Sequence, residues 1–338
     1  MMPPSFKAVL VDYDQELFTP PGWISAELAQ YGIEWVEGQH RTPETALKAA
    51  LPADVVLIQS VRPLLIRSVI EQLHRCRCIV RLGVGYDSVD VAAATAQGIP
   101  VCNIPAYCTD DVAEHALALL LESVRHLARQ DRWIREGRWD RSAARPNRLL
   151  QGGILGIIGL GRIGRALARR VSGFGLTLLV CDPNVDAETI AQYGGNKVDL
   201  DELLRRADFI SVHCPLDSIT YHLLSSREFG LMKEGVFLVN TSRGPVMDEA
   251  ALAAALQSGK VGGVGLDVLE QEPLPLDSPL RQFERVTITP HSAASAPESQ
   301  ENLYRMGCQI AIDVCNGRWP AEVINPDVKN TTPWNFDF

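Results

Sequence analysis

The chain has 338 residues, of which 46% are hydrophobic and 22% charged, a composition typical of a globular protein that folds as two domains. Its formal net charge of -9 argues against a dedicated nucleic-acid surface. No apolar run reaches the roughly 18 residues of a membrane span, and residues 1–7 lack the charged-then-apolar order of a signal peptide. Composition therefore predicts a soluble, cytoplasmic protein.

The eight cysteines are spread over the predicted strands and helices. Cys76 and Cys78 form the one close pair, and no second pair follows at zinc spacing. We therefore expect free thiols, buried among apolar residues in a reducing cytoplasm, and no metal site.

Short apolar runs alternate with helical stretches in the first hundred residues. Strands are predicted over residues 7–12, 33–36, 55–58 and 78–82, and helices over residues 25–31, 43–50 and 64–75. This alternation predicts a parallel, doubly wound sheet that is complete by about Asn103.

Two glycines, Gly83 and Gly85, follow the last of these strands. Their position predicts a carboxyl edge of the sheet, where open α/β sheets bind ligands and where unhindered backbone N–H groups can approach an anion. A plain strand-to-helix turn explains the same residues equally well. The spacing alone leaves both interpretations open.

From Asp110 onward apolar residues recur at helical spacing, which predicts a long helix through Leu127, capped by Thr109 or Asp110. We interpret His115 on this helix as a packing or capping residue rather than a catalytic one. Residues 129–148 are rich in arginine and tryptophan and have no clear periodicity. There we expect a solvated arm or a contact between subunits.

A buried strand, a glycine turn, a helix and a second strand then form one continuous run over residues 154–182. Gly159 permits the tight turn, Gly161 lets backbone N–H groups approach a pyrophosphate, and Gly164 lets the helix lie close to the strand. Asp182, which ends the second strand, can accept hydrogen bonds from an adenosine ribose and would repel a 2′-phosphate. The run therefore predicts a dinucleotide site that prefers NAD to NADP.

Further strands follow the dinucleotide-binding run at residues 209–213, 236–240, 263–267 and 286–289. Together with the two strands of that run they predict a second doubly wound parallel sheet. A helix over residues 248–258 begins with Asp248 as its cap. A final helix, roughly residues 297–317, could cross back to complete the first domain.

Polar side chains follow three strands of this second sheet. They are Arg243, Asp267 with Glu272, and His291. Because the carboxyl ends of parallel strands share one edge, these groups can converge near a nicotinamide. A guanidinium can bind a carboxylate and polarise a carbonyl, and a histidine can exchange the proton that accompanies hydride transfer. Glu272, if hydrogen-bonded to the imidazole, would favour its protonated form.

With these motifs the sequence resembles the D-isomer-specific 2-hydroxyacid dehydrogenase family, from about Val55 to Asn325. The resemblance rests on residues 82–87, 156–164, 212–216, 239–244, 265–273 and 289–293. It implies an α/β protein with two doubly wound parallel-sheet domains. A Rossmann NAD-binding domain, residues 105–292, would be inserted in a flavodoxin-like substrate domain, residues 1–104 and 293–338. It also implies a homodimer formed through the NAD-binding domain.

The resemblance further implies an NAD-dependent enzyme that transfers a hydride between nicotinamide and a D-2-hydroxy acid or 2-oxo acid. His291 would be the acid/base, Glu272 its partner, and Arg243 the group that binds and polarises the substrate. Backbone groups at Val84 and Gly85 would hold the substrate carboxylate. The residues expected to line the cofactor are Gly159, Gly161, Arg162, Ile163, Gly164, Asp182, His213, Cys214, Pro215, Thr220, Thr241 and Asp267, the last near the nicotinamide carboxamide.

The family also includes the C-terminal-binding-protein corepressors and phosphite dehydrogenase, so two alternatives stay open. Residues 79–83 and 98–106 look close to the corepressor branch, which would make the chain an NAD(H)-sensing scaffold. Ser295 occupies the place where those corepressors carry a tryptophan, which favours an enzyme. The sequence does not reveal the substrate's side chain. Arg62, in a first-domain loop, could meet a second anionic group or face solvent.

Overall fold

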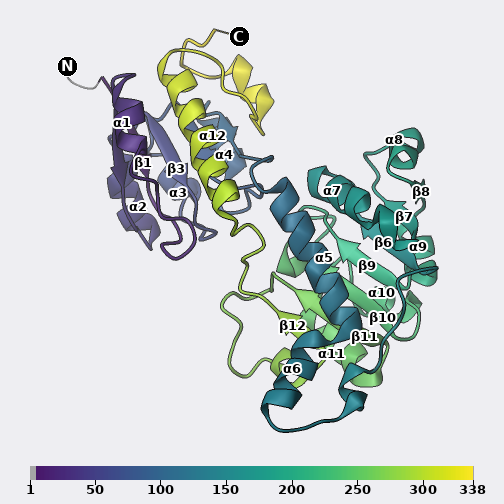
Figure 1. Ribbon diagram of the computed structural model, residues 1–338. Helices are drawn as coiled ribbons and strands as arrows, with labels where there is room; N and C mark the ends of the chain where they lie inside the picture. Colours follow the sequence, from purple (N-terminus) through teal and green to yellow (C-terminus); the bar gives the residue numbers. More distant parts are fainter. Residues whose placement is uncertain (1–4, 338) are drawn as a thin grey trace. The chain divides into compact units, whose positions relative to one another are not determined.

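The computed structural model describes residues 5–337. It divides the chain into two compact units. The first contains the residues up to Cys108 together with those from Ser295 onward, and the second runs from Thr109 to Ala294. In each unit helices pack against a parallel sheet (Figure 1), which confirms the predicted fold class.

Within the described residues, the first unit has a five-stranded sheet in the order β2-β1-β3-β4-β5. Its strands are β1 (Phe6–Leu10), β2 (Ile33–Glu37), β3 (Val55–Ile58), β4 (Cys78–Arg81) and β5 (Val101–Cys102). All neighbours pair in parallel, and the order is that of flavodoxin-like sheets. β3 and β4 are buried along their whole length, as expected of strands covered on both faces.

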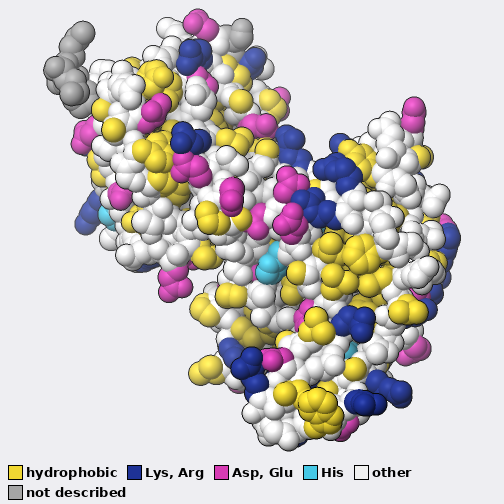
Figure 2. All heavy atoms as spheres, in the orientation of Figure 1, with side chains coloured by type: hydrophobic (Ala, Val, Ile, Leu, Met, Phe, Trp, Pro, Cys, Tyr) yellow, Lys and Arg dark blue, Asp and Glu magenta, His cyan; other side chains and the backbone are white. Residues whose placement is uncertain are grey.

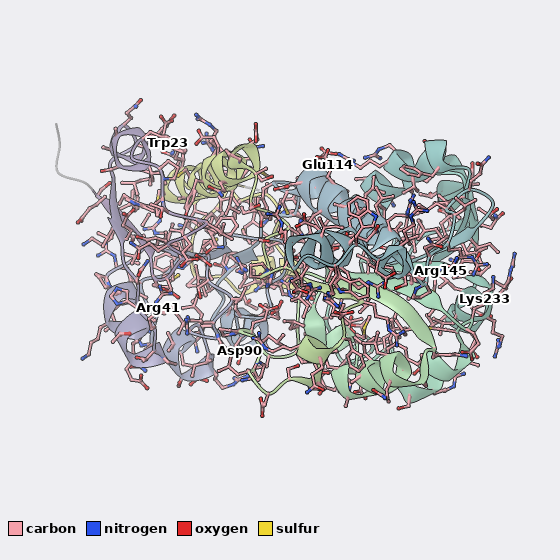
Figure 3. All side chains as sticks on the ribbon, turned by 60° about the horizontal axis from the view of Figure 1, so that its bottom comes forward. Trp23, Arg41, Asp90, Glu114, Arg145 and Lys233 are labelled. Atoms are coloured by element: carbon pink, nitrogen blue, oxygen red, sulfur yellow. The ribbon has the colours of Figure 1, made fainter. Side chains whose placement is uncertain are left out.

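The last long helix of the chain belongs to the first unit. The helices here are α1 (Ile24–Ala29), α2 (Pro43–Ala50), α3 (Arg67–Ile70), α4 (Val91–Ala96) and α12 (Pro297–Cys315). α12 packs against β3 and β4 and so covers part of the first sheet. Trp23, which precedes α1, links α1 to α12. The indole N–H of Trp23 donates to Glu301 (3.1 Å), and its ring centre lies 4.8 Å from the Arg305 guanidinium (Figure 3).

The helix predicted over residues 64–75 is much shorter in the structure, where α3 spans Arg67–Ile70. The chain then turns toward β4, and Arg75 donates two hydrogen bonds to Asp54 (3.2 and 3.0 Å). Asp54 is buried and also accepts from the backbone N–H of Lys7 (2.8 Å). The prediction was wrong here because this distant carboxylate, which local periodicity does not reveal, holds the chain in a turn.

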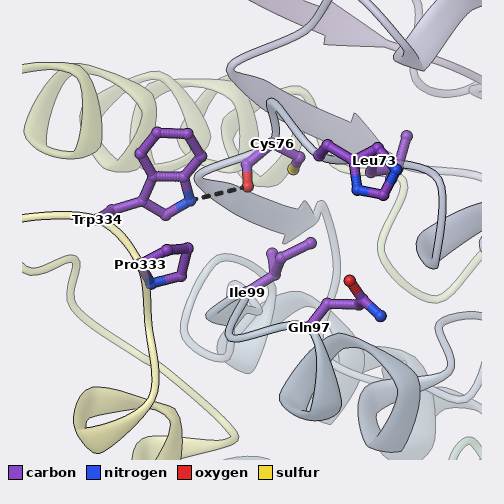
Figure 4. Close-up of a pocket in the computed structure, with 7 residues that line it drawn as sticks. Leu73, Cys76, Gln97, Ile99, Pro333 and Trp334 are labelled. Carbon is purple, nitrogen blue, oxygen red and sulfur yellow. Dashed lines mark hydrogen bonds between the residues drawn. The ribbon is translucent and has the colours of Figure 1, made fainter.

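The C-terminal segment, for which the sequence indicates no function, also packs on the first unit. Asn325 accepts a hydrogen bond from the backbone N–H of Val101 (2.8 Å), and the Trp334 indole donates to the carbonyl of Cys76 (3.1 Å) (Figure 4). A small cavity of about 150 Å³ lies there, lined by Leu73, His74, Cys76, Gln97, Ile99, Pro333 and Trp334.

The second unit has, among its described residues, a seven-stranded parallel sheet in the order β12-β11-β10-β9-β6-β7-β8. Its strands are β6 (Ile154–Ile158), β7 (Thr177–Cys181), β8 (Gly195–Lys197), β9 (Phe209–Val212), β10 (Val236–Asn240), β11 (Val261–Leu266) and β12 (Val286–Ile288). Counted from β6, this is the dinucleotide-binding order with one strand added, and the order reverses between β6 and β9. Ligands are expected at the carboxyl edge at that point.

Helices cover this second sheet. They are α5 (Thr109–Arg125), α6 (Leu127–Arg135), α7 (Arg162–Arg170), α8 (Ala187–Gln192), α9 (Leu200–Arg206), α10 (Ser226–Leu231) and α11 (Glu249–Ser258). Asp248 caps α11 as predicted, accepting from the backbone N–H of Ala251 (3.0 Å). α5 packs closely on β10 and β11, because a Cβ at Gly265 would lie 2.7 Å from that of Leu119.

The predicted long helix ends at Arg125, before Leu127, because His126 has a left-handed backbone (φ 52°). The carboxylate of Glu122 then accepts from the backbone N–H groups of Leu127 and Ala128, which caps α6. Residues 129–148 have no clear periodicity in the sequence, yet their first part is helical and belongs to α6. Beyond α6 the segment is a loop with one short 3₁₀ turn, and its Trp139 is 84% exposed.

The face shown in Figure 2 mixes side chains of both charges with apolar ones. Among residues 5–337, no helix combines the length and the apolar character needed to cross a bilayer.

Candidate active site

The glycine turn joins β6 to α7 at the point where the strand order reverses. Gly159 has φ +92°, and a Cβ on it would lie 2.7 Å from the backbone nitrogen of Cys214. A Cβ on Gly164 would collide with the carbonyl oxygen of Gly159, so the helix start can approach the strand only with glycine there. Gly161, in contrast, faces open space, because a Cβ on it would have no neighbour within 4 Å. The turn therefore leaves room for a phosphate at the start of α7.

Asp182 follows β7 and lies beside this turn. Its carboxylate accepts from the backbone N–H of Leu160 (2.7 Å) and from that of Asn184 (2.9 Å). An acid held against the glycine turn in this way fits the ribose-binding position of a dinucleotide site.

The segment after β9 packs against the same turn. His213 contacts the hydroxyl of Ser211 (2.8 Å), and desolvation lowers the pKa of His213 to about 4, so the ring is neutral at pH 7. Cys214 is buried and Pro215 exposed. The Thr220 hydroxyl donates to the carbonyl of Pro215 (2.6 Å), which fixes the loop that follows.

Thr241 lies directly after β10 and is 8% exposed. Its hydroxyl oxygen is buried, and no partner among the described residues hydrogen-bonds to it. A buried polar atom without a partner is costly, and a bound ligand would satisfy it. This hydroxyl, the open space at Gly161 and the acid at Asp182 together fit a bound dinucleotide.

His291 and Glu272 form a hydrogen-bonded pair, with 2.8 Å between Nδ1 and Oε2. Their side chains are 33% and 28% exposed. Burial by itself raises the pKa of Glu272, but the hydrogen bond and charge of His291, the backbone N–H of Leu269 and the charge of Arg243 together lower it below its usual value. Because an ionised Glu272 can only accept, Nδ1 of His291 carries a hydrogen and Nε2 is the ring nitrogen left for a substrate.

Arg243 follows β10 within the same group of residues. Asn240 donates its amide to the Arg243 carbonyl (2.9 Å), and the guanidinium donates to the carbonyl of Ser242 (2.8 Å). Its charge acts on Glu272, as the lowered pKa of that carboxyl indicates. The structure therefore brings Arg243, Glu272 and His291 together, as their positions after parallel strands predict.

Asp267 has contacts that the sequence did not predict. It is 1% exposed, and its carboxylate accepts from the backbone N–H groups of Ser292 (2.9 Å) and Ala293 (3.0 Å), while its own carbonyl accepts from the N–H of His291 (2.8 Å). His291 itself has a left-handed backbone (φ 53°). The buried carboxylate therefore holds the loop that carries His291.

Two further carboxylates, Glu249 and Glu270, were missed by sequence reasoning. Each accepts from the backbone N–H of the other, at 2.6 and 2.8 Å, which joins the start of α11 to the loop that carries Glu272. Burial, followed by the charges of Glu270 and Glu272, raises the pKa of Glu249. Glu249 could have been noticed in the sequence, because it directly follows the Asp248 cap and acidic residues favour the first helical turn.

The predicted substrate residues Val84, Gly85 and Arg62 lie in the first unit, and Arg162 and Ile163 begin α7 in the second unit. Asn103 donates its amide to the carbonyl of Val84 (2.7 Å), and because a trans peptide directs its C=O and N–H in opposite directions, this fixes the N–H of Gly85. Arg62 is half exposed, and its Nε lies 4.0 Å from the buried carboxylate of Asp12, which also pairs with Arg41 (2.8 Å).

A family model, two sequence relatives and a solved structure each match a large part of this chain. Residues 117–293 match the family model described as D-isomer specific 2-hydroxyacid dehydrogenase, NAD binding domain. A glyoxylate reductase of Korarchaeum cryptofilum is 35% identical over 94% of this chain and 99% of its own. A D-3-phosphoglycerate dehydrogenase of Mycobacterium tuberculosis is 40% identical over 87% of this chain and 54% of its own. The crystal structure of a glyoxylate reductase from Paecilomyes thermophila has a TM-score of 0.87 and 27% identity, covering 96% of this chain and 99% of that one.

Proposed function

Because the chain belongs to the D-isomer-specific 2-hydroxyacid dehydrogenase family and carries its NAD-binding domain, we propose that it interconverts a 2-oxo acid and a D-2-hydroxy acid through Arg243, Glu272 and His291. The observation that supports these residues is the 2.8 Å pair of His291 and Glu272, which has the Arg243 charge beside it and follows strands of the NAD-binding sheet. In this arrangement His291 is the proton donor, Glu272 holds its ring, and Arg243 supplies a fixed positive charge.

NAD supplies the hydride acceptor in oxidation and, as NADH, the hydride donor in reduction. We assign its pyrophosphate to the glycine turn at Gly161, its adenosine ribose to Asp182 and part of its nicotinamide half to the Thr241 hydroxyl. Arg243 binds the 2-oxo acid and steadies the negative charge that develops on its carbonyl oxygen. Nε2 of His291 delivers a proton to that oxygen in reduction and removes it in oxidation, while Glu272 orients the ring through its hydrogen bond to Nδ1.

We propose that the N–H groups at Val84 and Gly85 bind the substrate carboxylate, which suits a loop whose peptide plane Asn103 fixes. Arg62 is assigned to a second anionic group where the substrate has one. Its charge is already partly balanced by Asp12, so this contact is the weaker of the two proposals.

We also propose that the enzyme is a homodimer that works in the cytoplasm. The resemblance to the family supports the dimer, and we assign Trp139 (84% exposed) and Leu149 (77% exposed), on the loop after α6, to its contact. All eight cysteines are free thiols, which suits a reducing compartment.

A substrate screen tests the proposed reaction. Oxidation of NADH would be followed with glyoxylate, hydroxypyruvate, pyruvate, phenylpyruvate and longer 2-oxo acids, and reduction of NAD with phosphite in a parallel assay. We expect turnover with at least one 2-oxo acid, and glyoxylate is tested first because two of the similar proteins are named glyoxylate reductases. Turnover of phosphite alone would make the protein a phosphite dehydrogenase. NADH binding without any turnover, together with capture of specific protein partners, would favour the scaffold alternative.

Replacement of Asp182 tests the assignment of the ribose. In Asp182→Ser the charged acceptor is lost, and we expect Kd for NADH to rise about tenfold, since a hydrogen bond to a charged group contributes about 1.5 kcal/mol or more. The ratio of NADPH to NADH affinity should rise, because the repulsion of a 2′-phosphate disappears. Isothermal titration with both cofactors measures this, and a thermal melt controls for the lost bond to Leu160. An unchanged cofactor ratio would contradict the assignment.

A further inference from the structure

A polar chain inside the second unit joins α5 to the loop that carries His291. His115 lies on α5, and its Nε2 is 2.9 Å from the hydroxyl of Thr289 and 3.5 Å from Oδ1 of Asp267. The Thr289 hydroxyl is in turn 2.6 Å from the same Oδ1. The His115 side chain is 24% exposed and that of Asp267 is 1% exposed. The chain of contacts is therefore largely shielded from water, where hydrogen bonds gain strength.

The direction of these hydrogen bonds follows from donor counting. The carboxylate of Asp267 accepts from the backbone N–H groups of Ser292 and Ala293, so it acts as an acceptor toward Thr289 as well. The Thr289 hydroxyl has one hydrogen, which it donates to Asp267, and toward His115 it can only accept. Nε2 of His115 must then carry a hydrogen and donate it. This assigns the ring a definite role in the chain.

The chain of polar contacts that begins at His115 ends at the loop that carries His291. Asp267 accepts from the backbone of His291, Ser292 and Ala293, so every step from His115 ends at the residues that set the imidazole of His291. The left-handed backbone of His291 is unfavourable for a residue with a side chain, and it persists only where its surroundings hold it. Thr289 and Asp267 supply that support, and His115 fixes Thr289.

We propose that His115 is a positioning residue: by donating to Thr289 it orders the Asp267 carboxylate and thereby the loop that presents His291 to the substrate. This rests on the proposed role of His291 in proton transfer. The sequence alone suggested only packing or capping for His115, and packing on α5 would not require its particular nitrogen.

Two matched pairs of variants test this. His115→Leu removes the donor at similar size, and His115→Gln keeps an N–H near the position of Nε2. We expect His115→Leu to lower kcat for 2-oxo acid reduction about tenfold, the value of one ordinary hydrogen bond, while KM and the Kd of NADH stay within about twofold. His115→Gln should restore kcat to within about threefold of wild type. Thr289→Val and Thr289→Ser form the second pair, in which only valine should lower kcat.

A double variant separates a linked chain from independent effects. If His115 acts through Thr289, the loss in His115→Leu/Thr289→Val should be about that of the larger single variant rather than the product of both. Equal activity of His115→Leu and His115→Gln, or fully multiplicative losses, would overturn the proposal. If His115→Leu does not fold, the threonine pair decides in its place.

A measurement made without substrate tests the positioning role of His115 independently of the proposed reaction. In the NADH-free protein, the ¹⁵N NMR shifts of the His291 ring report whether Nδ1 carries the hydrogen that pairs with Glu272. We expect this population to fall in His115→Leu and to return in His115→Gln. An unchanged His291 signal in both variants would overturn the positioning role even where the enzyme reduces 2-oxo acids. A changed signal would support it even where no tested 2-oxo acid is reduced.

Discussion

Replacing His291 by alanine is expected to lower kcat for 2-oxo acid reduction by about 10²–10⁴-fold, the contribution typical of one acid–base group. The substrate oxygen then lacks the proton donor that Glu272 orients through its 2.8 Å hydrogen bond to Nδ1. The Kd of NADH should stay within about twofold, because the glycine turn and Asp182 are assigned to hold it. Stopped-flow kinetics with fluorescence titration of NADH measures both quantities.

The left-handed backbone at His291 requires a second variant. Asparagine tolerates this conformation better than alanine and also lacks the imidazole, so His291→Asn controls for strain. Both variants should show the same large loss of kcat. If His291→Asn kept near-wild-type kcat while His291→Ala did not, backbone strain rather than proton transfer would explain the loss.

Arg243→Ala should lower kcat/KM for the 2-oxo acid by about 10²–10³-fold, because the negative charge on the reacting oxygen loses its fixed donor. Arg243→Lys should recover part of the loss, since lysine keeps the charge but not the planar fork. Added guanidinium should restore some activity to Arg243→Ala and none to Arg243→Lys. Steady-state kinetics over a series of 2-oxo acid concentrations measures these effects.

The same variant has a consequence for Glu272. Arg243 is one of the groups that lower the pKa of this carboxyl, so in Arg243→Ala it should rise. A lowered carboxyl pKa contributes stability that is present above the unfolded value and lost as pH falls through the folded one. The variant should therefore lose less stability than wild type on acidification. Near-wild-type kcat/KM in Arg243→Ala, with an unchanged acid transition, would contradict the role given to the residue.

The fold was predictable because both sheets are built from short β-branched strands that alternate with helices along the sequence. The carboxyl-edge rule also predicted that Arg243, Glu272 and His291 lie close together. Other features depend on contacts that no local pattern encodes. The end of α5 at His126 requires one left-handed residue, and the shortened α3 depends on Asp54, which is distant in sequence.

The role of Asp267 illustrates the same limit within the site. Its position after β11 was readable, and the resemblance assigned it to the nicotinamide. Its hydrogen bonds to Ser292 and Ala293 depend on how the chain turns after β12, 25 or more residues later. Spacing indicates which side chains reach the same edge of a sheet, but it does not indicate which of them hold the others in place.

The composition of the first unit affects how the protein is made. Its sheet forms from residues before Cys108, yet α12 packs on β3 and β4 and comes from residues after Ser295. The ribosome therefore synthesises all of the second unit before it synthesises α12. The second unit can therefore fold during synthesis, while β3 and β4 keep an apolar face uncovered until α12 has been synthesised. A chaperone that binds nascent chains would meet this protein chiefly through its first hundred residues.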